Sequence, residues 1–140
     1  MVIDHKTLLN DARREVEELT PQEAMARLGR GDTVFVDLRD WLEIERDGAV
    51  PGAFHMPRGN LEFWIDPTSP YHKPVFASGK RFVFYCSAGW RSALSTQTAQ
   101  KMGLKPVCHV AGGFGAWREA GGPIETAAAR KQRETKEKTS

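Results

Sequence analysis

The chain reads Lys80-Arg-Phe-Val-Phe-Tyr-Cys-Ser-Ala-Gly-Trp-Arg-Ser92 and continues without a break into Ala93-Leu-Ser-Thr-Gln-Thr-Ala-Gln-Lys101. Five consecutive strand-forming residues, Phe82 to Cys86, predict a short buried strand. The segment from Ser92 to Met102 has good helix formers and contains neither Gly nor Pro, so it predicts a helix. The stretch as a whole therefore predicts a strand, a tight loop and a helix in succession.

Cys86 lies at the end of the predicted strand, in a position suited to a nucleophile. The next residues, Ser87, Ala88 and Gly89, are small enough for the backbone to curl with its N–H groups pointing inward. Such a nest beside a helix N-terminus binds negative charge. The thiolate is the reactive form of cysteine, and both the nest and Arg91 favour it. We therefore interpret Cys86 as a nucleophile; the alternative is one more small buried residue.

The loop Cys86-Ser-Ala-Gly-Trp-Arg-Ser92 resembles the active-site loop of the rhodanese family, which in many single-domain sulfurtransferases has the form Cys-x-x-Gly-x-Arg-Ser. Val36-Asp-Leu-Arg39 with Val50-Pro-Gly-Ala-Phe-His55, and then Val110-Ala-Gly-Gly-Phe-Gly-Ala-Trp117, resemble the other two signatures of that family in the right order. The similarity spans residues 20 to 124. Three ordered motifs make the resemblance specific, whereas the cysteine loop alone would not.

The resemblance implies sulfur transfer in two half-reactions through a persulfide on Cys86. The donor would be a small anion such as thiosulfate, and the acceptor would be cyanide or a thiol. The donor and the persulfide would be bound by the loop residues Ser87, Ala88, Gly89, Trp90, Arg91 and Ser92, with Arg91 attracting the anionic donor. Alternatively, the same persulfide would serve a carrier or sulfur-sensing module that delivers sulfur to a dedicated protein partner.

The spacing within the loop argues against phosphate chemistry. Cysteine phosphatases, including the relatives that share the rhodanese fold, separate Cys and Arg by five residues so that a phosphate fits between them, whereas four residues separate Cys86 from Arg91 here. Tyr85 also stands where classical tyrosine phosphatases place His. We therefore favour sulfur transfer over phosphatase or arsenate reductase activity.

Asp37 and Arg39 follow a predicted strand, Thr33 to Leu38, at its carboxyl end. In a parallel sheet the carboxyl ends of the strands form the ligand-binding rim, so these side chains could reach the same crevice as Cys86. In rhodanese-like proteins the corresponding Asp and Arg support the fold around the loop, and we expect the same supporting role here. A purely structural ion pair or a helix cap is the alternative.

Four predicted strands alternate with helical segments, which indicates an α/β fold with a mainly parallel sheet and helices on both faces. These strands lie near residues 33–38, 53–56, 82–86 and 107–110. The resemblance implies a three-layer α/β/α domain and adds a short fifth strand near Glu18 to Thr20. We expect a flanking helix within residues 1–19, the rhodanese-like domain over 20–124, and a basic tail, either a frayed helix or disordered, over 125–140.

The composition predicts a single soluble domain. A chain of 140 residues with 40% hydrophobic content can form one core without disulfides or metals. The net charge of +2 is too small to indicate nucleic-acid binding, and no segment approaches membrane-spanning length. The N-terminal segment lacks the charged and apolar regions of a signal peptide. We therefore expect a cytoplasmic protein without nucleic-acid or membrane partners; a homodimer or a sulfur-accepting protein partner stays open.

The two cysteines indicate a reducing compartment, because two do not make a disulfide framework. We expect Cys108, inside a predicted buried strand from Pro106 to Val110, to be inert, with the alternating His109 on the other face. If Cys108 instead faced the crevice, it could form a disulfide with Cys86. No histidines or cysteines have the spacing of metal ligands, so we expect neither a metal nor a cofactor.

Overall fold

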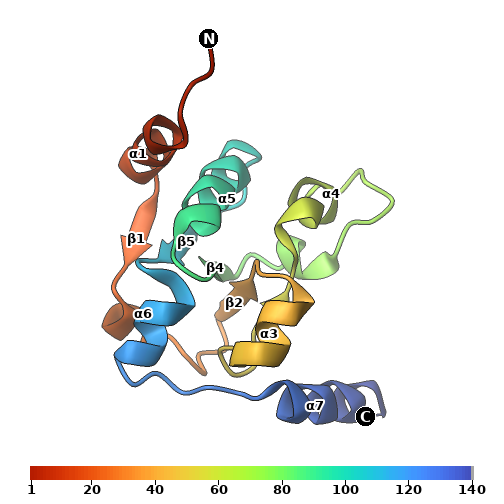
Figure 1. The fold of residues 1–140 in the computed structure, drawn as a ribbon. Coiled ribbons are helices and arrows are strands. Elements are labelled where there is room, and N and C mark those ends of the chain that lie inside the picture. Colours follow the sequence, from red (N-terminus) through yellow and green to blue (C-terminus); the bar gives the residue numbers. More distant parts are fainter. Residues whose placement is uncertain (140) are drawn as a thin grey trace.

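A five-stranded sheet forms the centre of the computed structural model, which describes residues 1–139 (Figure 1). Its strands are β1 (Glu17–Leu19), β2 (Thr33–Asp37), β3 (Phe54–His55), β4 (Arg81–Tyr85) and β5 (Val107–Val110). They lie in the order β1-β5-β4-β2-β3, and each neighbouring pair is parallel. The predicted parallel α/β sheet is confirmed, as is the short additional strand before residue 20.

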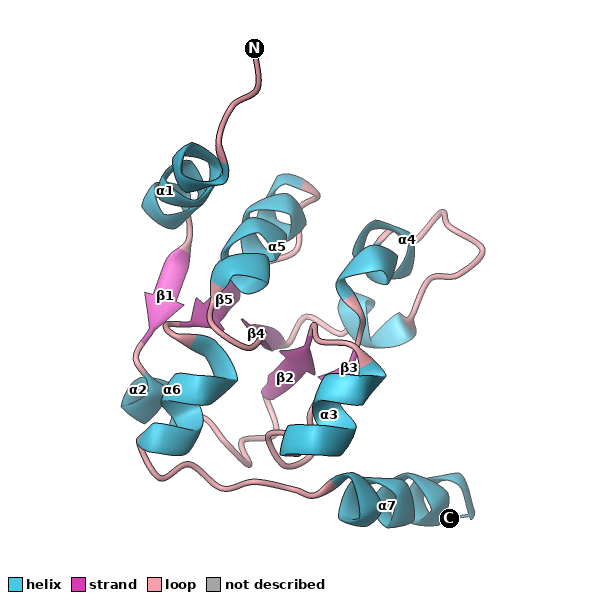
Figure 2. Cartoon of the chain, in the orientation of Figure 1, coloured by secondary structure: helices cyan, strands magenta, loops and turns pink. Residues whose placement is uncertain are grey.

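Helices cover both faces of this sheet and complete the three layers (Figures 1 and 2). One face carries α1 (His5–Glu15), α4 (Leu61–Ile65) and α5 (Trp90–Lys101); the other carries α2 (Pro21–Met25), α3 (Trp41–Asp47), α6 (Gly113–Glu119) and α7 (Ala127–Thr139). Two short 3-10 helices, Arg58–Asn60 and Pro74–Ala77, lie in the connection between β3 and β4. None of the helices within residues 1–139 is long and apolar enough to cross a membrane.

The sheet separates the two larger apolar clusters of the core, and β4 contributes to both; a third, small cluster lies between α1 and α5. Phe82 and Phe84 pack into one cluster, with Ala99 of α5, while Val83 and Tyr85 pack into the other. This alternation explains why β4 reads as a continuous apolar run, since a parallel strand between two helical layers is buried on both faces. Each buried Phe or Val contributes about 1.5–3 kcal/mol, so β4 fixes the sheet firmly below the cysteine loop.

Several predicted boundaries differ from the structure by a few residues. The helix after Cys86 begins at Trp90 rather than Ser92, and the strand before it runs from Arg81 to Tyr85 rather than from Phe82 to Cys86. A capping box opens α2, with Glu23 N–H donating to Thr20 Oγ1 and Thr20 N–H donating to Glu23. The N-terminal helix ends at Glu15 because the chain enters β1 at Glu17.

The segment after residue 124 is a helix docked on the domain, where the sequence predicted a frayed helix or a disordered tail. Arg130 of α7 is buried and donates to the backbone oxygen of Ala53 (2.8 Å). Ahead of α7, Glu125 exchanges two backbone hydrogen bonds with Ala49 (2.9 and 2.8 Å). This segment is thus held by an arginine side chain and by backbone hydrogen bonds. The spacing of apolar residues in the sequence does not reveal such contacts. The domain boundaries at residues 20 and 124 stay a prediction, and Ser140 lies outside the described residues.

Candidate active site

The loop after β4 reverses direction at Gly89 and rests on the turn that follows β5. Gly89 is the N-cap of α5 and has a φ of +95°, which favours glycine. From the turn after β5, Phe114 N–H donates to Cys86 O (2.7 Å) and Gly115 N–H donates to Ser87 O (3.1 Å). Gly113 has a φ of +63°, and a Cβ there would lie 2.5 Å from Cys86 O. The Gly112-Gly113 pair therefore lets two backbones approach closely.

Cys86 lies at the bottom of this loop with its thiol among hydrogen-bond donors. The residue is 1% exposed. The backbone N–H groups of Gly89 and Ser92 donate to its Sγ at 3.2 and 3.4 Å, and the thiol donates to Ser92 Oγ at 3.6 Å. Backbone donors directed at one sulfur stabilise negative charge there, because each N–H is the positive end of a dipole. The arrangement is the nest that the small residues of the loop predicted.

Arg91 is neutralised by a carboxylate that the sequence analysis did not single out. Its guanidinium donates to both oxygens of Glu43 on α3 (2.9 and 2.7 Å) and to Ser87 Oγ (3.2 Å). Ser87 Oγ also donates to Glu43 (2.7 Å). The hydrogen bonds from Arg91 hold the pKa of Glu43 well below its usual range, so Glu43 stays charged. Glu43 is the third residue of α3 and forms a capping box with Asp40, a local sequence pattern that could have pointed to it.

The remaining loop residues lie at the surface. Ala88 and Trp90 are exposed, and the Trp90 ring centroid lies 5.4 Å from that of His5 on α1. A cavity of about 260 Å³ lies between Trp90 and the first turns of α1. Trp90 and the N-terminal helix thus border one side of the loop.

Asp37 and Arg39 form a fully buried ion pair behind the loop. Two guanidinium nitrogens of Arg39 donate to the two carboxylate oxygens of Asp37 (3.0 and 2.8 Å), and Nη2 also donates to Gly48 O (2.7 Å). The Tyr85 hydroxyl donates to Asp37 Oδ2 (2.6 Å), since burial and then the Asp37 charge raise the pKa of Tyr85 and keep the phenol protonated.

This buried pair reaches the cysteine loop only through other residues. The guanidinium of Arg39 lies over the ring of Phe114 at 4.3 Å, and it is Phe114 whose N–H holds Cys86 O. Asp37 pairs in register with Tyr85, the residue before Cys86. The geometry therefore supports the expected role of Asp37 and Arg39 in holding the loop rather than in contacting a substrate.

Neighbouring residues of β5 face opposite sides of the sheet, as the alternation predicted. Cys108 packs in the cluster with Val83 and Trp117, and burial raises the pKa of its thiol to about 12. Both cysteines are free. His109 faces α5, and its Nδ1 lies 2.9 Å from Ser92 Oγ. Among residues 1–139 no three His, Cys, Asp or Glu side chains cluster as metal ligands.

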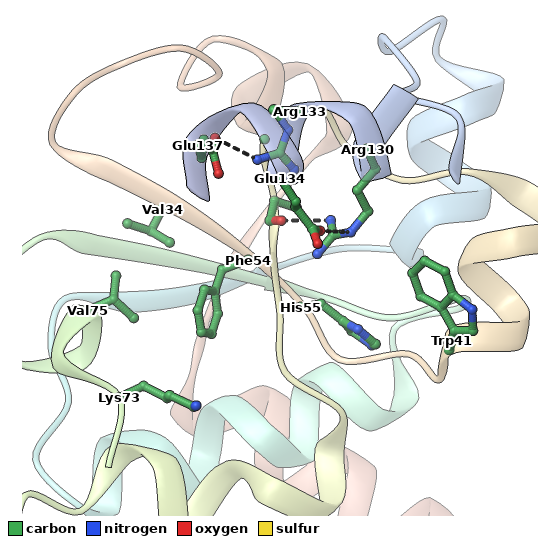
Figure 3. A pocket seen from close by; sticks show the side chains of 12 residues that line it. Val34, Trp41, Phe54, His55, Lys73, Val75, Arg130, Arg133, Glu134 and Glu137 are labelled. Carbon is green, nitrogen blue, oxygen red and sulfur yellow. Dashed lines mark hydrogen bonds and ion pairs between the residues drawn. The ribbon is translucent and has the colours of Figure 1, made fainter. Parts of the chain in front are cut away.

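A larger cavity, of about 680 Å³, lies away from the cysteine loop, between α7, β3 and the segment around Lys73 (Figure 3). Arg133 and Glu134 of α7, Trp41 and Phe54 are among its lining residues. Its two arginines are in ion pairs, Arg130 with Glu134 within α7 and Arg133 with Glu125 ahead of α7. None of residues 86–92 lines this cavity, so its size does not make it the candidate active site.

Comparison with known proteins shows the family to which this fold belongs. The family model of the rhodanese-like domain matches residues 20–120. Thiosulfate sulfurtransferase GlpE of Glaesserella parasuis is 32% identical over 108 residues, which cover 77% of this chain and 92% of that protein. Thiosulfate sulfurtransferase/rhodanese-like domain-containing protein 3 of Mus musculus is 30% identical over 104 residues, which cover 71% of this chain but only 66% of the mouse protein.

A solved structure with higher identity is that of RPA3614 from Rhodopseudomonas palustris, described as a protein of unknown function and a possible tyrosine phosphatase. It is 57% identical, superposes with a TM-score of 0.87, and the match covers 89% of this chain and 96% of that one. The family model covers well over half of the chain, and the solved relative shares its fold. This chain therefore belongs to the rhodanese-like family.

Proposed function

We propose that this protein is a sulfurtransferase that moves a sulfane sulfur from a small anionic donor, such as thiosulfate, to cyanide or a thiol. The observation that carries the proposal is the convergence of the Gly89 and Ser92 amides on Cys86 Sγ. Such donors stabilise a thiolate before the reaction and a persulfide anion after it. The thiosulfate sulfurtransferases among the relatives support the same reaction class.

The reaction would proceed in two balanced steps. The Cys86 thiolate attacks the outer sulfur of thiosulfate, the new S–S bond forms, and sulfite leaves with the electron pair of the broken S–S bond. Cyanide or a thiolate then attacks the outer sulfur of the persulfide, and the Cys86 thiolate is released. Each step is a nucleophilic displacement at sulfur, so the loop amides supply the main electrostatic stabilisation.

In this proposal Arg91 holds the loop in place, whereas its charge alone would suggest that it attracts the anionic donor. Because Glu43 engages its guanidinium through two hydrogen bonds, Arg91 offers little uncompensated positive charge to a donor. The pair instead ties the loop to α3 and, through Ser87, fixes the backbone just after Cys86. An anionic donor would meet the backbone N–H groups of the loop first.

Phosphatase activity is the second candidate, because RPA3614 is described as a possible tyrosine phosphatase. Two features of this chain oppose it. Only four residues separate Cys86 from Arg91, which is one fewer than phosphate-binding loops contain. In addition, Arg91 would have to leave Glu43 to bind a phosphate. The geometry therefore favours sulfur over phosphorus.

A carrier that hands its persulfide to one protein partner uses the same loop, and a homodimer is compatible with it. The cytoplasmic setting inferred from the two cysteines also stays part of the proposal. The discriminating measurement is thiocyanate formation from thiosulfate and cyanide, beside hydrolysis of p-nitrophenyl phosphate. Thiocyanate turnover that is lost in Cys86→Ser supports the enzyme. Phosphate release that depends on Cys86, without thiocyanate, would overturn the proposal.

A further inference from the structure

A chain of polar side chains leads from the buried sulfur of Cys86 to the surface of the sheet edge. The Cys86 thiol donates to Ser92 Oγ (3.6 Å), and Ser92 Oγ lies 2.9 Å from His109 Nδ1. On the other side of the imidazole, Nε2 lies 3.1 Å from Glu18 Oε2. Ser92 and His109 are fully buried, whereas the Glu18 side chain is 38% exposed. The chain thus spans three elements, α5, β5 and β1.

The sheet register explains why these residues meet. His109 of β5 is the direct register partner of Glu18 on β1, so their side chains lie next to each other on the same face. That face is covered by α5, whose first turn brings Ser92 above His109, and Figure 1 shows α5 lying over β5 with β1 at the edge. Cys86, Ser92, His109 and Glu18 come from four separate segments that the parallel crossovers bring together.

At neutral pH the His109 ring is neutral. Burial lowers the pKa of His109; the Glu18 carboxylate acts in the opposite direction, and Arg13 of α1, 3.8 Å from the same carboxylate, acts with burial. A neutral imidazole that carries its proton on Nε2 accepts a hydrogen bond from the Ser92 hydroxyl at Nδ1. No acceptor within residues 1–139 is well aligned with Nε2, so Glu18 acts on this ring through charge.

We propose that His109, acting through the Ser92 hydroxyl, receives the proton that Cys86 loses, and that Glu18 is the counter-charge of the resulting imidazolium. The inference deepens the proposed sulfur transfer and rests on it for its biological purpose. A buried thiol at 1% exposure has little direct contact with water, so an internal proton acceptor matters here. In this arrangement Cys86 is the nucleophile, His109 is the base and Glu18 is the group that orients the base.

The proton movement balances without any further reactant. The thiol proton passes to Ser92 Oγ while the Ser92 hydroxyl proton passes to His109 Nδ1, which leaves a thiolate and an imidazolium. The hydrogen bonds then reverse: His109 Nδ1–H donates to Ser92 Oγ, and the Ser92 hydroxyl donates to the sulfur. The same hydroxyl would remain directed at the persulfide after sulfur has been accepted.

The test is a pH titration of the Cys86 thiolate by its ultraviolet absorbance, in a Cys108→Ala background so that one thiol remains. Cys86→Ser in the same background supplies the blank for the tyrosines. We expect His109→Gln to raise the pH at which half of the thiolate has formed by about one unit, which corresponds to about tenfold less thiolate at neutral pH. The difference should vanish at strongly alkaline pH, where hydroxide ionises the thiol in every variant.

An exposed variant keeps the test decisive if His109→Gln does not fold. Glu18→Gln should shift the titration in the same direction, while Glu17→Gln, whose side chain lies near Arg81 (3.5 Å), should not. Identical titrations for the parent and a folded His109→Gln, or for Glu18→Gln and Glu17→Gln, would overturn the relay. No sulfur donor enters this assay, so its result is independent of whether Cys86 transfers sulfur.

Discussion

At the scale of single residues, Glu43 shows how one carboxylate can set the properties of a loop on another element. Replacing it by Gln removes the charge that Arg91 pairs with, and Arg91 is 39% exposed, so water screens part of the effect. We expect Glu43→Gln to lower the free energy of unfolding by about 1 kcal/mol at pH 7. Thermal melting of both proteins measures the difference.

The pH dependence of that difference has a defined sign. Arg91 depresses the pKa of Glu43 in the folded protein, whereas the unfolded chain keeps the ordinary value of 4.5. The stabilisation is therefore fully present above pH 4.5 and is lost as the pH falls through that value toward the folded pKa. The difference in melting temperature between the wild-type protein and Glu43→Gln should therefore become smaller in acid. A difference that stays constant would contradict the role given to this ion pair.

Gly113 is the second residue whose identity the loop requires. A Cβ at Gly113 would combine a positive φ with a contact of 2.5 Å to Cys86 O, whereas Gly121 has a positive φ and no atom within 4 Å of the corresponding position. Gly121→Ala should cost about 1 kcal/mol, and Gly113→Ala about 3 kcal/mol or more, with loss of activity as the loop shifts. Chemical denaturation compares the two, and equal costs would refute the close approach.

At the scale of elements, α7 is the part of the fold that the sequence pattern described least well. Its composition is charged, with hardly an apolar residue, and such a segment usually stays solvated. Arg130 nevertheless buries its side chain and satisfies the backbone oxygen of Ala53. The strands β2, β4 and β5 are easier to predict, because strands buried between two helical layers read as continuous apolar runs.

Removal of the Arg130 side chain tests the docking of α7. Arg130→Ala leaves the oxygen of Ala53 without this donor and should destabilise the fold by about 1–3 kcal/mol, while Lys131→Ala, on the exposed side of α7, should change stability by less than about 0.5 kcal/mol. Persulfide formation should be the same in both variants. Unfolding curves that match for the two substitutions would show that α7 is not anchored through Arg130.

At the scale of the whole molecule, the candidate site divides into parts that a sequence reveals and parts that it does not. Residue types at fixed spacing are enough to predict Cys86 and its loop as part of the site. The same holds for Asp37 and Arg39 at the end of a strand. His109 and Glu18 acquire their positions from strand order and register, which pair residues far apart in the sequence. Glu43 meets Arg91 because the fold brings α3 beside the cysteine loop. An arginine close behind the cysteine also suggested a free cation, and only the fold shows its carboxylate partner.

The central claim is that Cys86 forms a persulfide, and the intact mass of the protein after incubation with thiosulfate measures this directly. Cys86→Ser and Cys108→Ser are the matched variants. We expect the wild-type protein and Cys108→Ser to gain the mass of one sulfur atom, to lose it again on addition of cyanide, and Cys86→Ser to gain nothing. No gain in any protein with thiosulfate or with polysulfide, or an equal gain in Cys86→Ser, would contradict the account.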